Sequence, residues 1–338
     1  MKLIALLAVK NEELYLRYCL QNLISQGFDV YLIDNESTDD TVKIAKEFLN
    51  KGVITIDSLK TNGIFNLMKT LQYKESITNA LDADWFMHTD ADEIRLPHPP
   101  FKTIKEAVKK IESLGYNAVN FNAYYFLPEK GKSYVDRDYN KEMRYYYFHS
   151  PHPLTHIKLW KNERRPMSFG VSGGHQVSFE GMRIYPNPFI LKHFIFLSEE
   201  HGIEKYSRNR KFPEDEVKKL GWHGFRANFK KENFYIPSKS ELKKLTDNNF
   251  DTSDPKIEHP FYKMDEKQVK EEKSQEVHEE SINNELVQQV PPHKENQSNH
   301  RVKVRIKIYS FLLSIYRRLI PFRLRQKIKN ILMNTANY

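Results

Sequence analysis

The sequence contains a single cysteine, Cys19, among its 338 residues. One cysteine excludes an intrachain disulfide and any zinc site built from several cysteines, so nothing in the fold requires an oxidising compartment. Long apolar runs are also missing. No stretch approaches the ~20 residues of a membrane-spanning helix, and the apolar residues of 306–320 are interrupted by Lys307, Arg317 and Arg318. We therefore expect a cytosolic chain that does not cross a bilayer.

Acidic residues are missing from the C-terminal end. The chain has 53 Lys and Arg against 44 Asp and Glu, a formal net charge of +9, and ten of the cations lie from Arg301 onward with no acid among them. Because bulky apolar residues alternate with these cations over 301–333, we expect a basic amphipathic helix on an anionic membrane surface. The apolar content argues against a nucleic-acid-binding arm. A helix pair that binds a partner protein is the remaining alternative.

Residues 263–300 have almost no aromatic side chains and are rich in Glu, Gln, Lys and Asn. Such a segment cannot bury enough apolar surface to offset the entropy that it would lose on ordering. We predict a disordered linker here, between a globular body and the basic tail at 301–338.

Apolar runs alternate with helical patterns up to about residue 97. Leu3–Val9 lacks the length and cleavage site of a signal peptide and predicts a first strand, after which Asn11 is a candidate N-cap. Further expected strands are 30–33, 53–56 and 85–88, and expected helices are 41–49 and 66–81. This order predicts an α/β fold, with a mostly parallel sheet, helices on both faces and a ligand beyond the carboxyl ends of the strands.

Residues 98–262 are more aromatic and less regular, and they predict a second, substrate-shaping half. The expected helices are 103–114 and 199–211, the expected strand is 118–126, and the strand-like segments are 156–160, 175–179 and 189–196.

Three carboxylates follow the expected strand at 85–88. Asp90, Asp92 and Glu93 are costly to bury without a compensating cation or hydrogen-bond donors. Asp90 and Asp92 could together bind a hard divalent ion such as Mg²⁺ or Mn²⁺. A solvated acidic turn is the alternative for an isolated Asp-X-Asp. The first two strands also end in polar clusters, at 10–12 and 34–37, which favours the ligand site.

Three ordered segments resemble the signature segments of family 2 glycosyltransferases with the GT-A fold. They are Ala8-Val9-Lys10-Asn11-Glu12, the stretch 31–41 (YLIDNESTDDT) and Asp90-Ala91-Asp92-Glu93. Gly173-Gly174-His175 and the stretch 190–194 are similar to segments of bacterial members. The resemblance covers about residues 1–210. It implies a GT-A domain whose nucleotide-sugar half is 1–97 and whose acceptor half is 98–262.

The resemblance also assigns roles to residues. It implies that Ala8, Val9 and Glu12 line the nucleotide pocket and that Asp34 accepts a hydrogen bond from the base or ribose.

Asp90 would bind ribose and, with Asp92, a Mn²⁺ or Mg²⁺ cofactor that stabilises the departing diphosphate. A histidine of the second half often completes such a metal site. His193 is the first candidate and His175 the second, while a packing histidine is the alternative for each.

The general base of an inverting transfer is not identified by any motif. Asp136 and Glu180 are the first candidates, with Asp138 and Glu142 as further acids. For each of them an ordinary surface acid is the favoured alternative. The Gln-X-X-Arg-Trp motif of processive polysaccharide synthases is absent, which argues against a polymerising enzyme.

Other residues suit substrate contacts. Aromatic side chains at 124–126, 145–148, Trp160 and Trp222 offer flat faces for sugar rings, although core packing explains at least half of them. Lys205, Arg208 and Arg210 share one side of an expected helix and could reach a diphosphate.

These features together predict a metal-dependent, inverting glycosyltransferase that uses a nucleotide-diphosphate sugar, most simply a UDP-sugar. The expected acceptor is a glycan or lipid-linked molecule in cell-surface polysaccharide or lipopolysaccharide assembly, at the cytoplasmic face of the cell membrane, with no nucleic acid involved. The alternatives are a metal-dependent phosphohydrolase or nucleotidyltransferase, and a non-catalytic scaffold that binds sugar nucleotides.

Overall fold

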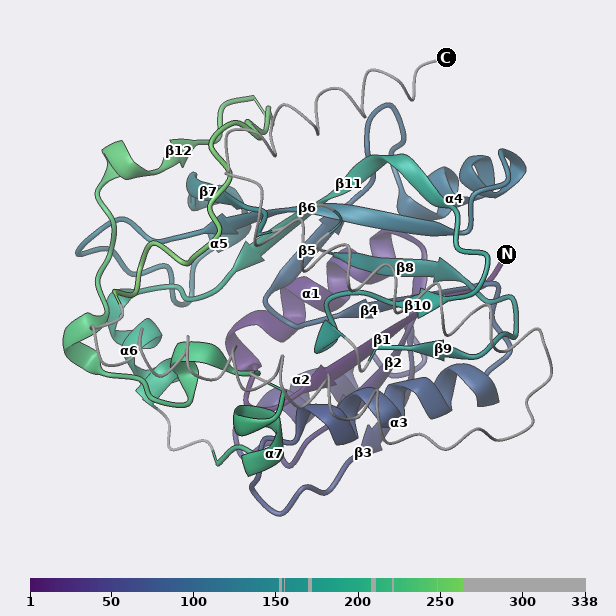
Figure 1. Cartoon of the computed structure of the whole chain (residues 1–338), viewed down its shortest axis with the longest axis horizontal. Coiled ribbons are helices and arrows are strands. Elements are labelled where there is room, and N and C mark those ends of the chain that lie inside the picture. The colour runs from purple at the N-terminus through teal and green to yellow at the C-terminus, as the bar shows by residue number, and fades with distance from the viewer. Residues whose placement is uncertain are drawn as a thin grey trace, which may run out of the picture. The chain divides into compact units, whose positions relative to one another are not determined.

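The computed structural model describes residues 1–151, 154, 156–169, 172–207, 211–220, 222–247 and 249–263 (Figure 1). All of them belong to one compact unit, Met1–Asn283. The predicted linker beyond residue 263, the basic tail, Arg208 and Arg210 lie outside the described residues. Within the described part of the chain, no helix has the length and apolar character needed to span a membrane.

The N-terminal half alternates strands and helices as the sequence predicts. Its elements are β1 (Leu3–Val9), α1 (Glu13–Ser25), β2 (Phe28–Asp34), α2 (Thr41–Glu47), β3 (Val53–Ser58), α3 (Leu67–Ala80) and β4 (Trp85–Thr89). The four strands are parallel in the order β3-β2-β1-β4. The carboxyl ends of these strands therefore share one edge.

The second half continues the same sheet. Its strands and α-helices are β5 (Glu93–Leu96), α4 (Ile104–Ser113), β6 (Ala118–Phe126), α5 (Tyr139–Glu142), β7 (Tyr145–His149), β8 (Ile157–Lys161), β11 (Ile184–Phe194), α6 (Glu199–Ser207), α7 (Glu214–Lys218) and β12 (Lys243–Lys244). β8 is antiparallel to β4 and is followed by β6, β7 and β12, while β11 pairs with β6 and β5. A separate pair is formed by β9 (Met167–Ser168) and β10 (Ser178–Phe179).

Alternate residues of β1 enter two different cores. Leu3, Ala5 and Leu7 pack in the larger core with α1 and α4, and Ile4 and Leu6 pack in the smaller core with α3. This is the two-residue period of a strand that is covered on both faces, and Figure 1 shows α3 and α4 well separated in the fold. The fold class predicted from the sequence is confirmed.

Three local expectations are wrong or incomplete. Asn11 does not cap α1, because Glu12 occupies the N-cap position and Asn11 has a φ of 54°. Its side-chain oxygen instead accepts a hydrogen bond from the Thr38 amide at 2.7 Å, which ties the loop after β2 to the end of β1. Only Ser178–Phe179 of the expected segment 175–179 is a strand. The short strand Glu93–Leu96 is not predicted from the sequence, because it directly follows the carboxylates Asp90 and Asp92.

Helix α6 lies unusually close to two aromatic rings because it contains Gly202. A Cβ atom at this residue would lie 2.5 Å from Phe234 Cζ and 3.0 Å from Phe196 Cγ. The missing side chain therefore permits the close approach of α6, and this helix carries Lys205 toward the carboxyl edge of the sheet.

We predict that Gly202→Ala destabilises the protein. Alanine favours a helix over glycine by ~1 kcal/mol, but overpacking a core typically costs about 1–3 kcal/mol. The midpoint of urea or thermal unfolding should therefore fall. Ser207→Ala, which changes an exposed side chain of the same helix, is the control and should leave the midpoint nearly unchanged. A higher midpoint for Gly202→Ala would show that α6 is not closely packed.

Candidate active site

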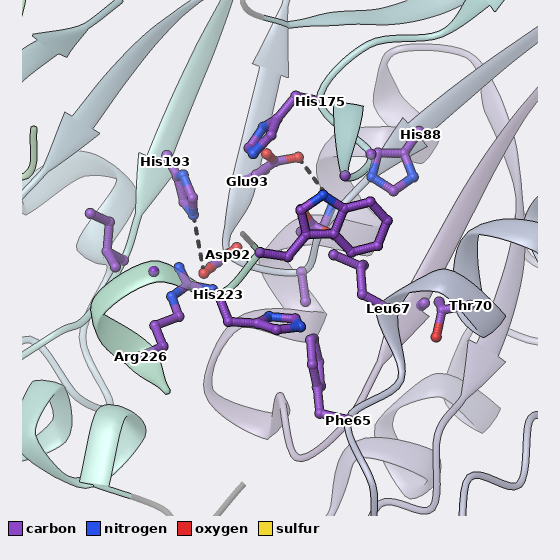
Figure 2. A pocket seen from close by; sticks show the side chains of 18 of the residues that line it. Phe65, Leu67, Thr70, His88, Asp92, Glu93, His175, His193, His223 and Arg226 are labelled. Carbon is purple, nitrogen blue, oxygen red and sulfur yellow. Dashed lines mark hydrogen bonds and ion pairs between the residues drawn. The ribbon is translucent and has the colours of Figure 1, made fainter. Parts of the chain in front are cut away.

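A pocket of about 640 Å³ opens at the carboxyl edge of the parallel strands. Ala8 and Val9 line it at the end of β1, Asn35 after β2, and the segment 90–93 after β4. Residues of the second half close the other side, among them His193 at the end of β11 (Figure 2). The topology thus places the pocket where the sequence predicts a ligand.

The turn after β4 is built around the buried carboxylate of Glu93. One oxygen, Oε2, accepts hydrogen bonds from the Asp90 amide at 3.0 Å and from Thr89 Oγ1 at 3.2 Å, and it also contacts Arg95. The other oxygen lies 3.3 Å from Lys158 Nζ on β8. Burial alone would raise the pKa of Glu93, but Arg95 and then Lys158 outweigh it and lower the pKa. Glu93 is therefore a charged structural anchor for the turn.

Asp92 is held by two groups of the second half. Its Oδ2 atom lies 2.8 Å from Lys205 Nζ on α6 and 3.2 Å from His193 Nε2 on β11, as Figure 2 shows for the histidine. Burial opposes ionisation of Asp92, but Lys205 and His193 hold its pKa well below the ordinary value. The structure therefore brings Asp92 and His193 together, and Lys205 joins them.

Asp90 has a more open environment. Its side chain is 49% exposed, and its Oδ2 atom lies 3.6 Å from Lys158 Nζ. Partial desolvation would raise the pKa of Asp90, but Lys158 and then Lys74 outweigh it and lower the pKa. A ligand in the pocket can therefore reach the carboxylate of Asp90 more easily than that of Asp92, which Lys205 and His193 already contact.

The donor set partly fits a divalent ion. Within the described residues, no three His, Cys, Asp or Glu side chains are arranged as a metal site. Two carboxylates are nevertheless enough for Mg²⁺-type ions, which take their remaining ligands from water and substrate phosphates. The Nδ1 atom of His193 is buried with no hydrogen-bond partner, so the ring is held mainly through Nε2 and Asp92. Asp90 and Asp92 thus fit such an ion when phosphate oxygens complete the set, and His193 would join them only after its Nε2 atom left Asp92.

The wall of the pocket at the ends of β1 and β2 contains most of the residues that the resemblance implies for a nucleotide. Ala8, Val9 and Glu12 line the pocket, and Asn35 lies beside them. Asp34 is not part of the lining; it accepts a hydrogen bond from the Ser37 amide at 3.2 Å and so shapes the loop that follows β2.

The comparison with known families now decides the class of protein. Residues 5–172 match the profile of the family described as Glycosyl transferase family 2. The chain belongs to this family. The match identifies residues 5–172 as a glycosyltransferase domain, and the mixed α/β sheet is the GT-A fold that the resemblance implies.

Solved structures with a similar chain fold are distant from this glycosyltransferase. TarS of S. aureus in complex with UDP-GlcNAc is 14% identical with a TM-score of 0.37, covering 69% of this chain and 74% of that chain. In another TarS structure the match spans only 37% of that chain, with a TM-score of 0.38 and 14% identity.

Glucosyl-3-phosphoglycerate synthase of Mycobacterium tuberculosis, in complex with Mn²⁺, UDP and glucosyl-3-phosphoglycerate, is 19% identical with a TM-score of 0.24, covering 37% of this chain and 44% of that chain. A search of curated proteins finds no match.

The candidate general bases of the glycosyltransferase are not brought to the pocket. Asp136 and Glu180 are exposed and absent from the lining. Asp138 caps α5 by accepting a hydrogen bond from the Lys141 amide, and Glu142 pairs with Arg137. Among the described residues beyond 98, the carboxylate that lines the pocket is Glu258.

The aromatic residues divide between pocket and core. Tyr125 and Trp222 line the pocket, whereas Trp160 is buried in the smaller core. The segment that carries Trp222 is attached to α3 through Glu216, which accepts hydrogen bonds from the Leu67 amide at 3.2 Å and the Met68 amide at 2.7 Å.

Sequence reasoning identifies His175 and His193 but misses most of the other basic residues of the pocket. Seven of the 13 histidines line the pocket, namely His88, His149, His156, His175, His193, His223 and His259. Lys74 and Lys158 line it too and are almost completely buried. One signal was available: Lys158 stands inside the apolar run Ile157-Lys158-Leu159-Trp160, where a buried cation requires a partner.

We predict that Glu93→Gln costs about 3–5 kcal/mol of stability, the usual loss when one member of a buried ion pair is removed. Thermal or urea unfolding at pH 7 measures the loss. Glu47→Gln, which removes an exposed partner of Arg17, is the control and should change the midpoint little.

The stability of the wild type and that of Glu93→Gln should depend differently on pH. Because the pKa of Glu93 is lowered in the folded state, its stabilisation is complete above the unfolded value of about 4.3 and is lost as pH falls through the folded value. The stability difference between wild type and Glu93→Gln should therefore shrink toward pH 3. A difference that stays constant from pH 7 to pH 3 would contradict the charged state of Glu93.

Proposed function

We propose that this glycosyltransferase transfers a sugar from a UDP-sugar to a glycan or lipid-linked acceptor, with inversion and with the help of a divalent ion. The observation that carries the proposal is the position of Asp90 and Asp92. Both follow β4 at the edge where β1 and β2 also end, and both line one pocket. Family membership favours sugar transfer over phosphate hydrolysis, nucleotidyl transfer or a non-catalytic scaffold.

The donor would enter along the ends of β1 and β2. Ala8, Val9 and Glu12 would contact the nucleoside, and Asn35 adds an amide beside them. Asp34 would accept a hydrogen bond from the base or ribose after a small movement of its loop, because its carboxylate now bonds to the Ser37 amide.

The diphosphate would lie against Asp90, Asp92 and His193, which would hold Mn²⁺ or Mg²⁺. Such an ion stabilises the negative charge that develops on the leaving diphosphate. Lys205 lies 2.8 Å from Asp92, so it keeps that carboxylate charged and oriented in the absence of other cations. It also places a positive side chain at the phosphate end of the pocket.

The acceptor would approach from the second half of the chain. An inverting transfer needs a base within hydrogen-bond reach of the acceptor hydroxyl. Glu258 is better placed for this role than Asp136 or Glu180, because it alone of the three lines the pocket.

The cellular setting is a further part of the proposal. The basic residues of 301–333 would hold the enzyme on anionic lipids at the cytoplasmic face of the membrane. A lipid-linked acceptor for cell-surface polysaccharide or lipopolysaccharide would then lie within reach of the catalytic pocket.

We expect Asp92→Asn to lower metal-dependent turnover of a UDP-sugar by about 10²–10³, the usual effect of removing one preorganised electrostatic group. Release of UDP from a panel of UDP-sugars, with Mn²⁺ or with EDTA, measures this. Asp82→Asn is the control, because Asp82 is exposed and pairs with Arg164 far from the pocket lining. Turnover that is equal with Mn²⁺ and EDTA would contradict the metal, and full activity of Asp92→Asn would contradict the site.

Removal of residues 301–338 should release the enzyme from anionic vesicles and leave turnover of the donor intact. Sedimentation with phosphatidylglycerol vesicles measures binding, and phosphatidylcholine vesicles are the control for charge. Salt should weaken the binding of the full chain, since exposed charges are screened. Equal sedimentation of the full and shortened chains would remove the membrane proposal.

A further inference from the structure

Buried cations outnumber acids around Glu93, at and just behind the pocket wall. Lys74 and Lys158 line the pocket and are 1% and 4% exposed, and Arg95, outside the lining, is 0% exposed. Arg95 and Lys158 pair with Glu93, which is 2% exposed, and Lys74 contacts His88. Even when the half-exposed Asp90 is included, three positive charges face two negative ones. A buried excess of positive charge is costly unless another group compensates it.

The same wall carries a histidine without a partner. His156 is 2% exposed and lines the pocket, and neither of its ring nitrogens has a hydrogen-bond partner among the described residues. Its backbone amide donates to Asn120 Oδ1 at 2.9 Å, which fixes the start of β8. His156 and Lys158 are two residues apart at the start of this strand, so they fall on the same face. The ring of His175 lies 5.6 Å from that of His156.

The protonation of His88 follows from its contact with Lys74. Lys74 Nζ lies 3.1 Å from His88 Nδ1, and an ammonium group can only donate, so Nδ1 accepts and Nε2 carries the hydrogen. A Cβ atom at Gly174 would lie 3.5 Å from His88 Nε2, so this donor faces the loop that carries His175. Figure 2 shows His88 and His175 on the same side of the pocket, away from Phe65 and His223.

From these contacts we propose that the wall formed by His156, Lys158 and His175 binds an anionic group, a phosphate or a carboxylate, on the acceptor. This inference rests on the proposed function. An anion would offset the excess charge and give His156 the hydrogen bond that it lacks. A metal ion is disfavoured there because Lys158 and Lys74 would repel it.

The position of the wall indicates that the anionic group belongs to the acceptor and not to the donor. His156 and Lys158 belong to β8 and the residue before it, in the half of the chain beyond β4, whereas Ala8 and Asn35 mark the nucleotide side. The alternative source is an acidic donor sugar, whose carboxylate would have to reach past the diphosphate to the same wall.

The test measures binding of glycerol 3-phosphate and inorganic phosphate to the full chain saturated with UDP and Mn²⁺, with glycerol as the neutral probe. Saturation with UDP prevents the probes from occupying the diphosphate site. We expect both phosphates, but not glycerol, to bind the wild type. His156→Leu and Lys158→Met should each weaken phosphate binding at least ~10-fold, the usual size of a charge-assisted hydrogen bond. Lys161→Met, on the same strand but paired with Glu112, should bind phosphate like the wild type.

A second measurement separates a binding role from a structural one. Because His156 has unsatisfied buried nitrogens, His156→Leu should raise the melting temperature of the ligand-free protein by about 2–4 °C. A purely structural histidine would give a lower melting temperature on replacement. Phosphate binding that is absent in the wild type, or equal in wild type and His156→Leu, would overturn the inference.

Two further outcomes are distinguishable. Tighter binding of UDP-glucuronate than of UDP-glucose, lost in His156→Leu, would assign the anion to the donor and overturn the acceptor assignment. Failure of the wild type to bind UDP at all would overturn the proposed function and this inference with it, whereas UDP binding without phosphate binding would overturn only the inference.

Discussion

The buried carboxylate of Glu93 is the constraint on which the pocket depends. It accepts hydrogen bonds from the turn that carries Asp90 and is surrounded by Arg95 and Lys158, so it links β4, β5 and β8 at one point. An ionised carboxylate this deeply buried is tolerated only with such partners. The turn therefore has little freedom to move, and the two aspartates that project from it keep a fixed relation to the strand ends.

From this fixed turn the two aspartates take different roles. Asp92 points toward the second half and is held by Lys205 and His193, whereas Asp90 stays half exposed in the pocket. The position of Lys205 depends in turn on the close packing of α6 at Gly202. Helix α6 thus connects the packing of the core with the electrostatics of the pocket. Asp92 links the two halves of the domain through its contacts with Lys205 and His193.

The sequence predicts the parallel half well, because its strands are short, mostly apolar runs, and β1, β2 and β4 are followed by polar clusters. It predicts the second half less well, since the antiparallel strands there are short and aromatic. Asp90, Asp92 and His193 are brought together as expected, but Lys205 was expected at a diphosphate rather than on Asp92. Asp136 and Glu180 illustrate the limit: residue type alone identifies an acid as a candidate base, whereas only tertiary structure decides whether it reaches the pocket.

The two walls of the pocket differ in their electrostatics for a physical reason. The wall at the ends of β1 and β2 carries Ala8, Val9 and Asn35 together with Lys10 and Glu12, whereas the other wall draws His88 from β4, Lys74 from α3 and Lys158 from β8. Burial, reinforced by Lys74 and Lys158 respectively, holds the pKa values of His88 and His156 well below the ordinary value. Both rings are therefore neutral beside the lysines, so they add hydrogen-bonding capacity without adding to the charge repulsion. A wall of this composition can stay packed without a ligand and still favour an anion over a cation or a neutral group.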